Sequence, residues 1–195
     1  MKTRLFIAAT LALLCAVLIL WQRSLANPLR YAVQGIDISH HQGDIDWTRL
    51  RSANLIFAYI KASEGGDWQD PKFTQNWHGA GRIGLKRGAY HYFSFCRPPE
   101  LQARNFLAAL SGKTANMPAA LDLEYGGACG APVDKVSMIA NVQVWIDAVE
   151  AVTGKPVIIY TTRDFHKAFL DGVLSRQPFW LRSIGRPPRY KSRPD

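Results

Sequence analysis

Residues 119–124, Ala-Ala-Leu-Asp-Leu-Glu, are a short apolar run that ends in two carboxylates. A run of this length and composition predicts a buried β-strand. Similar runs recur along the chain at 33–39, 55–60, 88–95, 157–161 and 179–181. Helical stretches separate these runs, and strand alternating with helix is typical of parallel βαβ units. We therefore expect an α/β fold, a barrel of the TIM type with about six strands.

Local signals also predict where the helices begin and end. Asp46 is a residue type that caps a helix, here one that starts at Trp47. Pro98 and Pro99 suit the first turn of a helix that runs to about Leu110. Further helices are expected at 73–83, 136–152 and 164–170.

The charge of the chain lies mostly at its two ends. The 24 Lys and Arg residues exceed the 15 Asp and Glu residues, which gives a net charge of +9. Residues 1–26 carry +3 and residues 176–195 carry +5, so residues 27–175 carry only +1. A nucleic-acid-binding protein would need a basic face on its folded body. We therefore expect no nucleic-acid partner, and we interpret the region from about 182 as a basic tail.

Residues 1–26 have the pattern of an export signal. Lys2 and Arg4 precede an uncharged apolar run at 5–21, and small residues before Asn27 suit cleavage there. The apolar run is also long enough to remain uncut as an anchor in the inner membrane. We expect export to the periplasm or the extracellular space by one of these routes, with residues 27–195 as the exported domain.

The chain lacks the motifs of several common cofactor sites. No G-x-G-x-x-G follows the first predicted strand and no G-x-x-x-x-G-K-[ST] occurs, so no nucleotide site is indicated. No C-x-x-C or H-E-x-x-H occurs, so no metal site is indicated either. We expect a protein that works without a cofactor.

Carboxylates follow the predicted strands at their carboxyl ends, which form the active-site face of a parallel barrel. Asp122 and Glu124 are two residues apart on one strand, so their side chains point to the same face, about 6.5–7 Å apart along the backbone. Neighbouring carboxylates oppose each other's ionisation, which leaves an acid beside an anion, as glycosidic cleavage requires. The spacing leaves inverting and retaining chemistry open. The alternative is a structural Asp beside an exposed Glu, but Asp37 at another strand end favours a site.

Aromatic and sulfur-containing side chains accompany these carboxylates. Tyr90 and Tyr92 alternate with His91, so the tyrosines share the face opposite the histidine, which we interpret as a core residue. The tyrosines could form a sugar-stacking platform or simply pack. Cys96 and Cys129 follow neighbouring strand ends and could pair in an oxidising compartment, or remain two buried thiols.

Five short motifs follow one another along the chain: G-I-D-I-S-H-H-Q-G at 35–43, K-A-S-E-G at 61–65, D-P-K-F at 70–73, G-A-Y-H-Y-F at 88–93 and D-L-E at 122–124. In this order they resemble the glycoside hydrolase family 25 lysozymes, the Chalaropsis-type N-acetylmuramidases. The resemblance covers about 33–180. It implies cleavage of the β-1,4 bond between N-acetylmuramic acid and N-acetylglucosamine in peptidoglycan. We expect the protein to be a monomer.

The resemblance also implies roles for individual residues. Glu124 would be the general acid, Asp122 would assist it, and Asp37 would be a third carboxylate of the site. The residues expected to line the substrate groove are Lys61, Tyr90, Tyr92 and Tyr160.

One feature departs from the family pattern. The family barrel continues past the sixth strand, whereas this sequence ends at Asp195. The sequence therefore predicts an incomplete barrel without its closing strands, and it leaves a peptidoglycan-binding protein of weak or absent activity as the alternative function.

Overall fold

The computed structural model describes residues 14–15, 31–127, 129–131 and 134–184. The chain divides into two units, and the larger one, residues 33–181, contains the sheet. Nearly all of the predicted leader and the predicted tail beyond Ile184 lie outside the described residues, so both remain predictions. Within the described residues, no helix combines the length and apolarity needed to cross a membrane.

The sheet follows the strand order β1-β2-β4-β5-β6-β7. Its strands are β1 (Gly35–Ile38), β2 (Phe57–Glu64), β4 (Lys86–Tyr92), β5 (Ala120–Leu123), β6 (Ile158–Thr162) and β7 (Phe179–Arg182). The pairs from β1 to β6 are parallel, and a two-residue strand, β3 (Trp68–Gln69), pairs antiparallel with β2. The predicted α/β class and all six predicted strands are confirmed. β3 was not predicted, because two residues show no periodicity.

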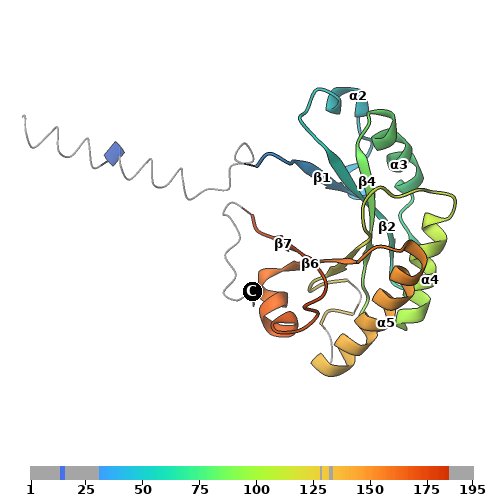
Figure 1. Cartoon of the computed structure of the whole chain (residues 1–195), viewed down its shortest axis with the longest axis vertical. Coiled ribbons are helices and arrows are strands. Elements are labelled where there is room, and N and C mark those ends of the chain that lie inside the picture. Colours follow the sequence, from blue (N-terminus) through green and yellow to red (C-terminus); the bar gives the residue numbers. More distant parts are fainter. Residues whose placement is uncertain (1–13, 16–30, 128, 132–133, 185–195) are drawn as a thin grey trace, which may run out of the picture. The chain divides into compact units, whose positions relative to one another are not determined.

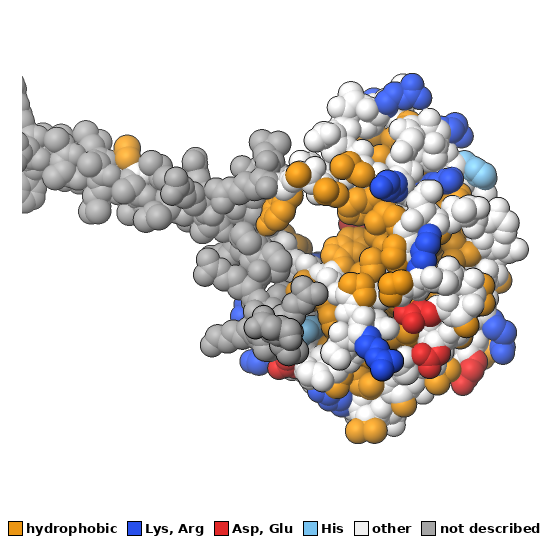
Figure 2. Space-filling view, viewed as in Figure 1, with side chains coloured by type: hydrophobic (Ala, Val, Ile, Leu, Met, Phe, Trp, Pro, Cys, Tyr) orange, Lys and Arg blue, Asp and Glu red, His pale blue; other side chains and the backbone are white. Residues whose placement is uncertain are grey.

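The sheet curls into a half-barrel with the helices along its outer side (Figure 1). These helices are α2 (Trp47–Leu50), α3 (Phe73–Arg82), α4 (Pro99–Leu110) and α5 (Lys135–Thr153), and a three-residue helix, α6 (Arg163–Phe165), follows β6. The concave side borders a hollow edged by apolar side chains (Figure 2). This architecture is compatible with the predicted incomplete TIM-type barrel.

A side-chain cap begins α2, as the sequence predicted. The Asp46 carboxylate accepts hydrogen bonds from the backbone N–H groups of Thr48 and Arg49, both at 3.1 Å. The helix α5 ends at Gly154, which adopts the left-handed conformation with φ of 64°. The predicted helix at 164–170 is instead the short helix α6 followed by a π-helix, η3 (His166–Leu170). A short 3-10 helix, η2 (His40–Gln42), precedes α2.

A β-bulge in β2 decides which residues face the concave side. The pairing with β4 steps from Lys61↔Tyr90 to Ser63↔His91, so Ala62 is the extra residue. In a regular strand Lys61 and Glu64 would point to opposite faces, because they are three residues apart. The bulge brings both to one face, where the Lys61 ammonium lies 2.7 Å from the Glu64 carboxylate.

His91 points to the outer, helix-covered face of the sheet and is fully buried. Its Nδ1 lies 2.8 Å from the Ser63 hydroxyl, and its Nε2 lies 3.2 Å from Oε1 of Gln102. Its ring stacks on Trp145 at 5.5 Å. His91 is therefore a core residue with polar partners, as predicted.

The stability of the protein is expected to fall as the pH drops from about 6.5 towards 3. Burial, with a smaller contribution from the Lys61 charge, lowers the pKa of His91 to about 3, against 6.5 for an ordinary histidine. In this range His91 binds a proton in the unfolded chain but not in the folded chain. Each pH unit of acidification therefore lowers the free energy of unfolding by up to about 1.4 kcal/mol. Urea denaturation across this range should show a shallower pH slope for His91→Gln than for the wild type. An unchanged slope would contradict the prediction, and His78→Gln, which replaces an exposed histidine of α3, is the matched control.

Candidate active site

A cavity of about 120 Å³ opens where the strands end on the concave side of the half-barrel. Six side chains on or just after five strands line it: Asp37, Tyr90, Asp122, Glu124, Tyr160 and Trp180. The structure therefore brings together all three predicted carboxylates and two of the predicted groove tyrosines.

Strand register explains why these side chains meet. Asp122 lies level with Tyr92 on one neighbouring strand and with Tyr160 on the other. Residues level with each other in a parallel sheet point to the same face, so this row faces the concave side together. Asp37 reaches the same face from β1, where it is level with Tyr59.

The three carboxylates differ in exposure. Asp122 is buried, Glu124 is half-buried just beyond the end of β5, and Asp37 is exposed. A group that donates a proton to a bound substrate has to be reachable from the cavity, and Glu124 at the strand end meets that requirement. Asp122 lies deeper and close to it.

Tyr90 and Tyr92 remain neutral on this face. Burial raises the pKa of Tyr90 well above its usual range, and the carboxylates of Asp122 and Asp37 raise it further. Burial and the charges of Asp122 and Glu124 raise the pKa of Tyr92 in the same way. Both phenols therefore keep their O–H donors at neutral pH, next to carboxylates and within reach of a polar ligand.

Trp180 is a lining residue that the sequence analysis did not identify. Its ring lies 5.1 Å from the ring of Tyr160 and 5.1 Å from that of Tyr59. The sequence placed Trp180 correctly on a strand but showed nothing about its face. A three-residue run is too short for alternation to assign its sides.

Lys61 and Tyr92 lie beside this cavity rather than in its lining. The Lys61 ammonium stands 5.1 Å from the ring centroids of both Tyr92 and Trp68. Tyr92 lines a second cavity of about 130 Å³, together with Glu64 and Trp68. Of the predicted groove residues, Tyr90 and Tyr160 thus line the first cavity, Tyr92 lines the second, and Lys61 lines neither.

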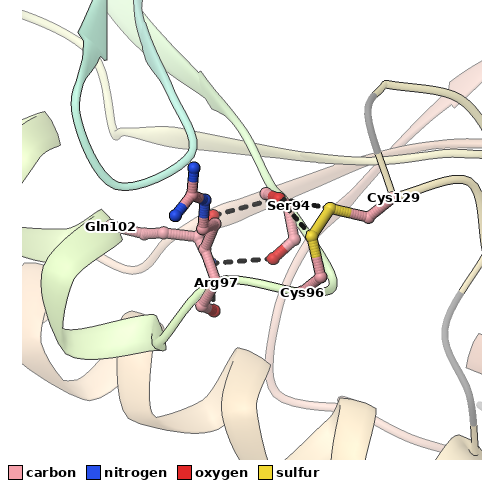
Figure 3. The surroundings of a disulfide bond; sticks show 5 residues. All are labelled: Ser94, Cys96, Arg97, Gln102 and Cys129. Atoms are coloured by element: carbon pink, nitrogen blue, oxygen red, sulfur yellow. Dashed lines mark hydrogen bonds between the residues drawn. A yellow bond between two sulfur atoms is a disulfide. The ribbon is translucent and has the colours of Figure 1, made fainter.

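Cys96 and Cys129 form a disulfide between the segments that follow β4 and β5 (Figure 3). Their Cα atoms are 5.7 Å apart, and the bond closes a separation of 33 residues. The Ser94 hydroxyl lies 3.1 Å from the Cys129 sulfur. The sequence left two alternatives open for these cysteines, a disulfide or two buried thiols, and the structure contains the disulfide.

Removing this disulfide should lower the free energy of unfolding by about 3–4 kcal/mol, because a loop of this length constrains the unfolded chain. Urea denaturation of the double variant Cys96→Ser/Cys129→Ser would measure the loss. Dithiothreitol should destabilise the wild type by a similar amount and leave the double variant unchanged. A wild type that gains no mass on reduction would show that the bond is absent.

The described residues contain no group of three or more His, Cys, Asp or Glu side chains arranged to hold a metal ion. The side chains that line the cavity supply carboxylates, phenols and an indole.

Comparison with known proteins decides the family. The model of the glycosyl hydrolases family 25 matches residues 36–193. The chain belongs to glycosyl hydrolase family 25. It is 38% identical to the uncharacterized protein YegX of Escherichia coli (strain K12) over 173 residues, which is 86% of this chain and 60% of YegX.

Other family members agree with this assignment. Lysozyme M1 of Streptomyces globisporus is 35% identical over 167 residues, 78% of this chain and 55% of that protein. A family 25 glycosyl hydrolase structure from Bacillus anthracis superimposes with a TM-score of 0.75 at 32% identity, covering 82% of this chain and 74% of that one. The chain thus spans about 55–60% of the length of these two curated relatives.

Proposed function

We propose that this family 25 protein is a peptidoglycan hydrolase that cleaves the β-1,4 bond between N-acetylmuramic acid and N-acetylglucosamine. The observation that carries the proposal is the convergence of Asp37, Asp122 and Glu124 on one cavity with tyrosine and tryptophan rings. Carboxylates supply the acid and the negative charge that glycosidic cleavage needs, and aromatic rings suit the faces of sugars. The similarity to Lysozyme M1 supports the same substrate.

Glu124 acts as the general acid in this proposal. Its proton passes to the glycosidic oxygen as the bond from that oxygen to the anomeric carbon breaks, and a water molecule then supplies the hydroxyl of the new reducing end. Asp122 assists, either by steering the N-acetyl group of the substrate as an internal nucleophile or by stabilising the positive charge. Asp37 shapes the exposed side of the site.

The tyrosines and Trp180 hold the sugar. Tyr90 keeps its O–H donor because burial and the nearby carboxylates raise its pKa. The edge-to-face pair of Tyr160 and Trp180, at 83°, fixes two rings on the wall of the cavity. Peptidoglycan lies outside the cytoplasm, and the Cys96–Cys129 disulfide supports export to an oxidising compartment.

The identity of the new reducing end tests the proposal. Purified peptidoglycan is digested with the full chain, the products are reduced with borohydride, and the sugar alcohols are separated after acid hydrolysis. The alcohol of muramic acid is the expected product. The alcohol of glucosamine would mean cleavage of the other glycosidic bond, and absence of both would contradict the proposed activity.

A further inference from the structure

The second cavity is related to the candidate catalytic one through Tyr92, which is level with Asp122 on the neighbouring strand. Tyr92 lines the second cavity, and the charges of Asp122 and Glu124 reach its phenol. The loop after Glu124 packs closely against Tyr92. A Cβ atom would lie only 3.0 Å from the Tyr92 hydroxyl if it were added to Gly126, and 3.0 Å from the Tyr92 ring if it were added to Gly127. A ligand bound at the carboxylates would have to extend past Tyr92 to reach the second cavity.

The walls of the second cavity are held by buried side chains of α4. On one wall, the amide of Gln102 accepts from the Ser94 N–H at 2.7 Å and donates to the Ser94 and Arg97 carbonyls at 2.9 Å (Figure 3). On another wall, the amide of Asn105 donates to the Gly65 carbonyl at 3.1 Å and to the Trp68 carbonyl at 3.0 Å. The disulfide closes the third side. The cavity is thus pre-organised, which reduces the entropy lost when a ligand binds.

The lining of the second cavity carries charges of both signs. Arg97 and Asp67 are exposed, Glu64 is half-buried in its pair with Lys61, and Trp68 and Tyr92 supply aromatic surface. N-acetylglucosamine is neutral, and N-acetylmuramic acid without its peptide carries only the carboxylate of its lactyl group, so bare glycan offers no cation to the acidic side chains. The peptide stem of peptidoglycan carries free carboxylates and an amine, so it matches charges of both signs.

We propose that the second cavity binds the peptide stem attached to N-acetylmuramic acid, with the Arg97 guanidinium pairing with a stem carboxylate. The inference rests on the proposed function. An arginine–carboxylate pair is planar and can be bidentate, so it selects a carboxylate over a neutral group. The stem carboxylates lie farther from the sugar ring than the lactyl carboxylate of bare glycan, so Arg97 in the second cavity distinguishes the two by position and determines specificity for stem-bearing glycan.

The test compares two forms of one substrate: purified peptidoglycan strands, and the same strands after an amidase has removed their peptide stems and left each lactyl group as a free carboxylate on its sugar. The readout is kcat/KM for the release of reducing ends. We expect the wild type to prefer the stem-bearing strands by about tenfold, the size typical of a charge-assisted hydrogen bond. Arg97→Gln should lose this preference and cleave the stripped strands at the wild-type rate.

Two further variants make the comparison specific. Arg104→Gln removes an exposed arginine from the same segment of the chain, on α4, and should leave both rates unchanged. Arg97→Lys keeps the charge without the bidentate geometry and should retain part of the preference. The thermal midpoint of each variant checks its folding. Arg97 accepts a hydrogen bond from Gln102 through its backbone carbonyl and donates one to Ser94 through its backbone N–H, and a change of its side chain leaves both groups in place.

The outcomes separate this inference from the proposed function. Equal cleavage of both substrates by the wild type, or an equal loss on both in Arg97→Gln, would overturn the stem site and leave the hydrolase intact. A wild type that releases no reducing ends from either substrate would overturn the proposed function and the inference together.

Discussion

Glu124→Gln is expected to lower the release of reducing sugar from purified peptidoglycan by about 10²–10⁴-fold. The substitution preserves the size of the side chain and its capacity to accept a hydrogen bond, but an amide cannot deliver a proton to the glycosidic oxygen. Glu124 is half-buried beyond the end of β5, so the fold should tolerate an uncharged amide there.

The comparison requires both activity and binding. The rate is measured for the wild type, for Glu124→Gln and for Glu100→Gln, which replaces an exposed glutamate in the first turn of α4. The control should retain full activity. Pull-down on insoluble peptidoglycan should show that Glu124→Gln still binds. If Glu124→Gln released sugar at the wild-type rate, Glu124 would not be the general acid.

Trp145→Ala should cost about 3–5 kcal/mol of unfolding free energy, the range for removing a large aromatic side chain from a core. Trp145 is fully buried on α5. Its ring stacks on His91 at 5.5 Å and lies 5.2 Å from Phe106 of α4. The substitution therefore removes a contact that joins the sheet to two helices at once.

Urea denaturation monitored by far-UV circular dichroism measures this loss. Val144→Ala is the matched control, because it shortens the neighbouring, 39% exposed side chain of the same helix and should cost less than about 1 kcal/mol. Trp145→Phe keeps most of the apolar volume and should fall between the two. Equal stability of Trp145→Ala and Val144→Ala would show that this contact does not stabilise the core.

Most of the secondary structure was predictable because its signals are local. The cap of α2 depends on Asp46 and the two following N–H groups, and the end of α5 depends on the left-handed Gly154. The alternation of Tyr90, His91 and Tyr92 correctly separated the concave face from the helix-covered face. The predicted end of β2 was wrong by four residues, since its pairing with β4 extends the strand to Glu64.

The candidate site was predictable only in part. Asp122 and Glu124 share one short segment, so strand geometry alone placed them together. The meeting of Asp37 with them depended on the parallel order of strands, which the βαβ pattern indicated. Trp180 and the second cavity carry no local signal, because packing between distant segments creates them.

The sequence by itself determined the helices and strands, the α/β class and the carboxylates at the strand ends, because each depends on neighbours within a few residues. It also determined the family resemblance, which depends on the order of the motifs. The tertiary structure decided which side chains share a cavity. The bulge at Ala62 is the clearest case: it turns Glu64 to the face of Lys61, where the pair forms at 2.7 Å. A bulge arises from the match between two strands, so the sequence of one strand does not reveal it.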